Sequence, residues 1–211
     1  MTVRLYSYWR SSAAYRVRIA LNLKGIEHTI VPVDLAAGQQ AEADYAGRNP
    51  QGLVPLFEDG DIRLTQSQAI VEYLDERYPE PALYPAAALD RARVRAFAGA
   101  IACDIHPLNN LRVLKYLKGP LGQDAAAVDT WYAHWIHAGF KALEAQAGDG
   151  PHVFGDTVSA ADLFLIPQIY NARRFEIALD EFPKLLAVDT ACARLPAFRD
   201  AAPEAQADAP S

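Results

Sequence analysis

The feature that most constrains the fold is the alternation of strand and helix signals along the first 80 residues. Residues 3–6 alternate apolar and polar side chains, as a half-buried strand does. Ser11 or Ser12 then offers an N-cap for a helix that continues to Leu23. The remaining signals follow as strand, helix, two strands joined by a hairpin, and a last helix. This order predicts a small α/β domain around a four-stranded sheet.

The turn before the first helix carries residue types that can do chemistry. A helix N-terminus presents free backbone N–H groups and a partial positive charge, so it stabilises an anion, including a thiolate. Arg10, Ser11 and Ser12 place a guanidinium and two hydroxyls at that point. An ordinary capped helix has the same pattern, so these residues alone leave both interpretations open.

Three further features of this region point to a peptide-like ligand. The Val54–Pro55 bond lies between apolar runs, and a cis peptide there would turn the backbone of Val54 outward as a free sheet edge. Gln66 and Ser67 open the next helix and offer a second anion site. Gln40, in a polar segment, could reach a carboxylate. A short peptide with acidic ends and a central thiol would satisfy all of these groups.

The second part of the chain reads as helical. Prolines at positions 79, 81 and 85 mark a linker, and beyond it every long segment has a helical apolar period. We therefore predict an α/β sandwich of thioredoxin type over residues 1–80 and an all-helical domain over residues 86–211. Residues 201–211 have no apolar period, which predicts a disordered tail.

Composition excludes several classes of function. The formal net charge is −6 and no basic run occurs, which argues against a nucleic-acid partner. No apolar run approaches the roughly 18 residues of a membrane span, and no signal peptide is evident. Cys103 and Cys192 belong to no C-x-x-C motif, so we expect reduced thiols in a cytoplasmic protein. His134 and His137 have no third ligand nearby, so no metal site is predicted.

Taken together, these motifs resemble the glutathione transferase family, and within it the zeta class. The Ser-Ser pair followed by Arg-Val-Arg-Ile-Ala-Leu is specific to that class, whereas the Val-Pro and Gln-Ser elements are general to the superfamily. The resemblance covers about residues 3–200 and rests on residues 8–21, 38–40, 49–55, 66–74, 103–114, 161–162 and 171–175.

The resemblance implies a role for each site residue, with glutathione bound by the first domain and substrate by the second. Ser11 would stand against the glutathione sulfur, where the helix N-terminus lowers the thiol pKa. The implied catalytic residues are Ser11, Ser12 and Arg10. The implied glutathione-binding residues are Gln40, Val54, Pro55, Gln66, Ser67, His106, Asn109 and Asn110. The implied substrate-binding residues are Arg10, Arg112 and Arg174.

The implied reaction is the cis–trans isomerisation of a keto dicarboxylic acid. Glutathione thiolate adds to the cis double bond, the resulting single bond rotates, and glutathione leaves as a regenerated cofactor. Maleylacetoacetate from tyrosine or phenylalanine breakdown is the first expectation for the substrate. Maleylpyruvate from gentisate breakdown and the conjugation of general electrophiles are the alternatives. The resemblance also implies a homodimer.

Some assignments stay open at this level. The zeta pattern usually has a cysteine where this chain has Ala13, which puts in doubt any step that uses a protein thiol there. Arg173 could take the role of the arginine that follows it. His106 could pack in the core or contact glutathione or the substrate, and Asn109 and Asn110 could serve local structure instead of a ligand.

Overall fold

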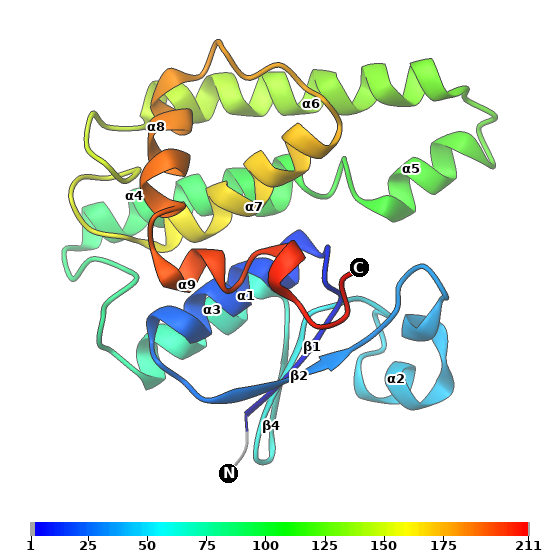
Figure 1. The fold of residues 1–211 in the computed structure, drawn as a ribbon, viewed down its shortest axis with the longest axis horizontal. Coiled ribbons are helices and arrows are strands. Elements are labelled where there is room, and N and C mark those ends of the chain that lie inside the picture. Colours follow the sequence, from blue (N-terminus) through cyan, green and yellow to red (C-terminus); the bar gives the residue numbers. More distant parts are fainter. Residues whose placement is uncertain (1–2, 211) are drawn as a thin grey trace. The chain divides into compact units, whose positions relative to one another are not determined.

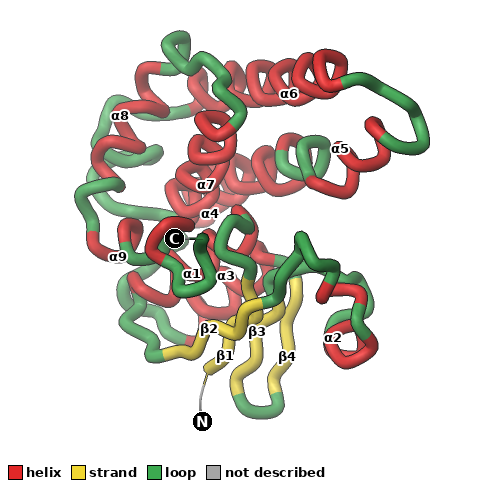
Figure 2. Tube along the Cα trace, turned by 45° about the vertical axis from the view of Figure 1, so that its right-hand side comes forward, coloured by secondary structure: helices red, strands yellow, loops and turns green. Residues whose placement is uncertain are grey.

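The computed structural model describes residues 3–210, which form two compact units. The first unit combines Met1–Leu83 with Ala193–Ser211, and the second is Tyr84–Cys192. The strands belong to the first unit, and the second is built from helices and loops (Figures 1 and 2). This architecture confirms the predicted fold class.

The sheet of the described residues is mixed and has the order β2-β1-β3-β4. β1 pairs in parallel with β2 and antiparallel with β3, and β3 and β4 form a hairpin. Leu5 in the central strand lies opposite Ile30 on one side and Phe57 on the other. Pro32 ends an edge strand, where its missing N–H costs no ladder bond. The strands are β1 (Val3–Ser7), β2 (His28–Pro32), β3 (Leu56–Asp59) and β4 (Ile62–Thr65).

Two long helices of the first unit, α1 and α3, pack against each other, and α9 packs on α1. α1 is buried over most of its length because apolar residues such as Val17 and Leu21 recur on it. The helices of this unit are α1 (Ser12–Leu23), η1 (Gln39–Ala41), α2 (Ala43–Arg48), α3 (Ser67–Arg77), α9 (Pro196–Arg199) and η3 (Pro203–Ala205).

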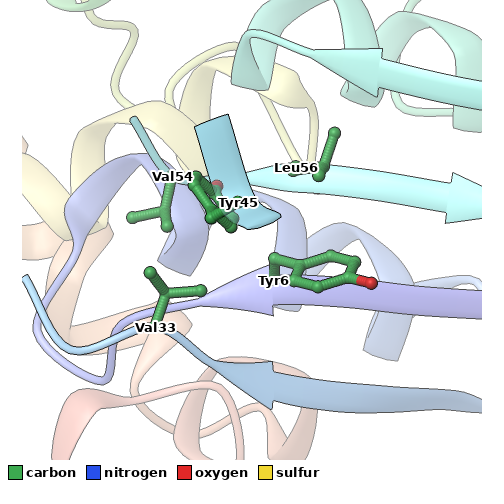
Figure 3. Packing of buried hydrophobic residues seen from close by; sticks show 5 residues of the cluster. All are labelled: Tyr6, Val33, Tyr45, Val54 and Leu56. Atoms are coloured by element: carbon green, nitrogen blue, oxygen red, sulfur yellow. The ribbon is translucent and has the colours of Figure 1, made fainter. Parts of the chain in front are cut away.

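A small apolar cluster anchors the segment between β2 and β3. Figure 3 shows its side chains, which come from β1, β3, α2 and the loops after β2 and before β3. Burial raises the pKa of one member, Tyr45, to about 12, and its hydroxyl donates to the carbonyl of Leu53 at 2.6 Å. This contact fixes the chain just before Val54. The buried members are Tyr6, Val33, Tyr45, Val54 and Leu56.

The second unit is built around α7, which is buried on all sides from Ala160 to Ile169, as its continuous apolar run predicts. Among residues 3–210, no helix combines the length and apolar content needed to cross a bilayer. The helices of this unit are α4 (Ala88–Gly99), η2 (Ala100–Ile105, a π-helix), α5 (Leu111–Lys118), α6 (Ala125–Gln146), α7 (Ala160–Arg174) and α8 (Pro183–Cys192).

The expectation of a disordered tail over residues 201–211 is wrong for its described part, residues 201–210. Ala201 and Pro203 are buried, and the backbone carbonyl of Ala201 accepts a hydrogen bond from Arg18 in α1. Ser211 lies outside the described residues. The composition of the tail is misleading because the segment has no periodic apolar face. It is held by two isolated buried residues, one backbone carbonyl and one carboxylate.

Candidate functional site

The turn between β1 and α1 presents a serine hydroxyl at a helix start. The backbone N–H of Ser11 donates to the carbonyl of Tyr8 at 2.8 Å, which closes the turn. Ser11 is the N-cap of α1, and its Oγ accepts from the N–H of Ala14 at 3.2 Å. Because that contact uses a lone pair, the hydroxyl proton can be donated to a ligand. Ser12 is the first residue of α1 and is buried, so Ser11 is the more accessible hydroxyl.

The charge distribution at this helix start suits an anion. The first turn of α1 contains no acidic residue, so no carboxylate of its own offsets the partial positive charge of the helix. The guanidinium of Arg10 adds positive charge in the same turn, and its Cζ lies 5.1 Å from the ring centre of Trp9. The arrangement can lower the pKa of a thiol bound beside Ser11.

A buried arginine connects this helix start with the start of α3. Arg16 is 1% exposed, and its Nη1 donates to Oγ of Ser67 at 3.2 Å. Ser67 opens α3, which has no acidic residue in its first turn either. Gln66 before it has φ 69°, in the left-handed region that non-glycine residues seldom occupy. No motif in the sequence marks Arg16 as part of this contact; the available signal is a charged residue within an apolar helix.

Gln66 and Gln40 are linked through the loop before β3. Nε2 of Gln66 donates to Oε1 of Gln51 at 2.9 Å. The next residue, Gly52, has φ +60°, and a Cβ there would lie 3.2 Å from the backbone oxygen of Gln40, so both the backbone conformation and the close approach favour glycine. Oε1 of Gln40 is buried and has no hydrogen-bond partner within the described chain. These contacts bring Gln40, Gln66 and Ser67 into one region of the first unit.

The Val54–Pro55 peptide is cis, the conformation in which the backbone of Val54 was expected to form a free sheet edge. The carbonyl of Leu53 just before it accepts from the hydroxyl of Tyr45 and from Nδ2 of Asn49, both at 2.6 Å. Asn49 is itself buried. The backbone on which the expected sheet edge depends is therefore held by side chains from α2 and the loop after it.

In the second unit, the two candidate asparagines lie in the loop between η2 and α5 and differ in their hydrogen bonds. Asn110 is the N-cap of α5, and its side chain accepts from the N–H of Arg112 at 3.1 Å, which supports a local structural role. Asn109 is 8% exposed, and neither polar atom of its side chain has a partner within residues 3–210. His106 follows η2 and is half-buried. Asn109 is the member of this loop with unused hydrogen-bonding capacity.

The two neighbouring arginines at the end of α7 differ in their surroundings. Nη2 of Arg173 lies 2.6 Å from a carboxylate oxygen of Asp189, which makes an ion pair. Cζ of Arg174 lies 4.6 Å from the ring centre of Phe175, which stacks on Tyr132 at 3.8 Å. Burial raises the pKa of Tyr132 to about 12, although Arg174 opposes the rise. Arg173 is thus held by a carboxylate, whereas Arg174 lies beside an aromatic pair. Arg112 is an exposed residue of α5.

A group of potential metal ligands, which no sequence spacing revealed, lies at the start of α7. Ligand atoms of His152, Asp162 and Cys192 all lie within 4.8 Å of one another. The carboxylate of Asp162 already accepts from the N–H groups of Val153 at 2.9 Å and Ser159 at 2.8 Å. Burial raises the pKa of the Cys192 thiol above its usual value. These contacts hold the start of α7 in place.

Comparison with known families gives matches in both parts of the chain. Residues 1–76 match the family described as the glutathione S-transferase N-terminal domain, and residues 125–203 match the glutathione S-transferase C-terminal domain. The chain is 48% identical over 210 residues to the maleylpyruvate isomerase of a Ralstonia species, covering 98% of this chain and 99% of the relative. It is 45% identical over 213 residues to the maleylacetoacetate isomerase of Pseudomonas aeruginosa, covering 99% of this chain and 100% of the relative.

Solved structures give the same result. The chain resembles a holo structure of maleyl pyruvate isomerase, described as a bacterial zeta-class glutathione S-transferase, with a TM-score of 0.96 and 47% identity over 98% of this chain and 100% of the other. It also resembles the maleylacetoacetate isomerase of Anaeromyxobacter dehalogenans with bound glutathione in its active site. That match has a TM-score of 0.89 and 44% identity over 99% of this chain and 98% of the other.

Proposed function

The chain belongs to the glutathione S-transferase family, and from this premise we propose that it is a glutathione-dependent cis–trans isomerase of a keto dicarboxylic acid. The observation that carries the proposal is the hydroxyl of Ser11 at the start of a helix with no acid in its first turn. A thiolate placed there gains a hydrogen bond and a favourable helix dipole.

The first unit supplies the groups that a glutathione molecule needs. Ser11 donates to the thiolate, and the start of α3, with Gln66 and Ser67, binds a carboxylate through backbone N–H groups and a hydroxyl. Gln40 reaches the second carboxylate, and the backbone of Val54 pairs with the extended peptide. The linked contacts among these residues support their assignment to one ligand.

The chemistry divides into three balanced steps. The glutathione sulfur forms a bond to one carbon of the cis double bond, and the electron pair of that double bond moves onto the conjugated keto oxygen as an enolate. The former double bond, now single, rotates. The enolate electrons then re-form the double bond in the trans geometry and expel the thiolate, so glutathione is regenerated. No step requires a protein thiol at position 13, where this chain has alanine.

Positive charge is the second requirement of this reaction, because the substrate is a dicarboxylate and the intermediate is an enolate. Arginine binds carboxylates with paired N–H donors and stabilises developing negative charge on oxygen. We assign Arg10, Arg112 and Arg174 to these tasks. The ion pair of Arg173 with Asp189 supports its neighbour as the substrate ligand.

The preferred substrate is proposed to be maleylacetoacetate, with maleylpyruvate as the alternative. A relative named maleylacetoacetate isomerase and one named maleylpyruvate isomerase have nearly the same identity to this chain, 45% and 48%. The two substrates share the reacting double bond and differ at one end, a difference that a pocket discriminates by only a modest factor.

The deciding experiment measures isomerisation of both compounds side by side, with and without glutathione. We expect glutathione-dependent turnover, and the ratio of kcat/KM values assigns the pathway. If glutathione binds and neither compound is isomerised, the proposal is wrong. Turnover of an apolar electrophile in that case would identify a conjugating transferase.

A matched pair of variants tests the arginine assignment. Arg174→Ala should raise KM for the dicarboxylate about tenfold, because one charge-assisted carboxylate contact is lost. Arg173→Ala should leave KM within about twofold and act on stability through the lost ion pair. The reverse pattern would transfer the role to Arg173. Arg10→Ala should reduce turnover and leave glutathione affinity nearly unchanged.

The proposal extends to a homodimer in the cytoplasm. Two cysteines without a disulfide, one exposed and one buried, fit a reducing compartment. Sedimentation of the purified chain tests the oligomeric state, and a monomer at micromolar concentration would contradict it.

A further inference from the structure

The turn that carries Arg10 and Ser11 is held from outside by the C-terminal segment. The backbone N–H of Trp9 donates to Oδ2 of Asp208 at 2.9 Å, across 199 positions of sequence. The carbonyl of Trp9 accepts from Nη2 of Arg18 at 3.0 Å. Both backbone polar groups of a central turn residue are therefore fixed by side chains from other segments.

Arg18 ties the same segments together a second time. It is 1% exposed, and a buried guanidinium requires acceptors because it stays charged. Besides the Trp9 contact, its Nε donates to the carbonyl of Ala201 at 2.9 Å, and its Nη1 donates to Oγ of Ser7 at 3.0 Å. One side chain thus joins the end of β1, the turn and the C-terminal segment.

The segment that carries Asp208 has defined internal structure. Nε2 of Gln206 donates to the carbonyls of Asp200 at 3.0 Å and Ala202 at 2.9 Å. The N–H of Ala209 donates to the carbonyl of Gln206 at 3.0 Å, which closes a turn around Asp208. The carboxylate of Asp208 therefore has a defined position, because the segment that carries it is ordered by its own hydrogen bonds.

We propose that Asp208 is a positioning residue for the turn Tyr8–Ser11. The guanidinium of Arg10 rests on the ring of Trp9, and the N–H of Ser11 bonds to the carbonyl of Tyr8. Rotation of the Trp9 backbone would therefore displace both groups, and small displacements of reacting groups reduce rates strongly. The inference depends on the proposed function in one respect, namely that Arg10 and Ser11 take part in the reaction.

The kinetic test compares three variants of the full chain. Asp208→Ala removes the acceptor and should lower kcat about 5- to 10-fold, with KM for glutathione within about twofold. It should also raise the pKa of the bound glutathione thiol, followed by the ultraviolet absorbance of the thiolate. Asp208→Asn keeps an acceptor oxygen and should restore both values. Asp200→Ala, which removes an exposed carboxylate of the same segment, should match the wild type.

Amide hydrogen exchange gives a readout that does not depend on activity. Asp208→Ala should speed exchange at Trp9 about tenfold, with Ile19 inside α1 unchanged. Unchanged exchange at Trp9, wild-type kcat in Asp208→Ala, or equal losses in the alanine and asparagine variants would each overturn the proposal. If the wild type isomerises neither substrate but the bound thiol pKa and Trp9 exchange respond as expected, the proposed reaction fails and the positioning role stands.

Discussion

Two helices of this chain start from a serine N-cap and use it in opposite ways. α1 follows Ser11 in the first unit, and α7 follows Ser159 in the second. The first turn of α1 has no acid, whereas α7 has Asp162 at its third position. That carboxylate accepts from the backbone N–H of Ser159 at 2.8 Å and from its hydroxyl at 3.1 Å.

The comparison shows how one carboxylate separates a structural cap from a ligand site. Both helix starts offer N–H donors and a partial positive charge. At α7 the chain fills that site with its own buried anion, Asp162, which is 0% exposed. At α1 the first turn has no acidic residue, the carboxylate of Asp208 bonds to the N–H of Trp9 in the preceding turn, and the N-cap Ser11 remains half-buried. The start of α1 is therefore suited to an anion supplied from outside, such as a thiolate.

Removing the buried carboxylate of Asp162 should have the largest effect, and this effect should be a loss of stability. Asp162→Ala leaves the N–H groups of Val153 and Ser159 without their acceptor in a buried place, which should cost about 3 kcal/mol of unfolding free energy. Urea unfolding measures the loss. Asp129→Ala, which removes an exposed carboxylate of α6, should change stability by less than about 0.5 kcal/mol. Equal stability of the two variants would refute the capping account.

Removing the hydroxyl at α1 should act mainly on catalysis. Ser11→Ala should lower kcat/KM about 10- to 100-fold, because the thiolate loses its donor, and should cost about 1 kcal/mol of stability. The matched change at the other helix, Ser159→Ala, should destabilise the fold while leaving the kinetics of the folded enzyme unchanged. If both variants lost kcat/KM to a similar extent, the proposal that Ser11 acts in catalysis and Ser159 only in structure would be wrong.

Adding an acid to α1 should make it resemble α7. Ala13→Asp places a carboxylate in the first turn of α1, where it competes with the bound thiolate for the helix dipole. We expect about fivefold weaker glutathione binding and a higher pKa of the bound thiol. The isosteric Ala13→Asn should have little effect on either quantity. Calorimetry and thiolate absorbance distinguish the two, and equal binding by both variants would count against the electrostatic argument.

The smallest expected effect is a pH dependence of the unfolding free energy that arises at the start of α7. A hydrogen bond to Asp162 raises the pKa of His152 above its usual value, with their nearest atoms 3.6 Å apart. The protonated form therefore stabilises the fold below the unfolded pKa of about 6.5, and this contribution is lost as the pH rises through the folded value. Wild type should lose more unfolding free energy than His152→Gln between about pH 6 and pH 8. Parallel pH profiles would disprove the linkage.

Local signals in the sequence correctly predicted many features. The order of strands and helices and the N-cap Ser11 agree with the structure. Each of these depends on residues within a few positions of one another, because helix periods and caps are formed by near neighbours. The sequence also carried the family resemblance that the comparisons support.

Only the tertiary structure decided which distant residues meet. It placed Arg16 on Ser67, paired Arg173 with Asp189, and brought Cys192 to His152. It also gave the C-terminal segment, which has no apolar period, a defined structure against α1 and the turn before it. The physical reason is that these contacts join single polar atoms across many residues of chain. Such pairs leave no periodic pattern in the sequence and become visible only once the fold has set their positions.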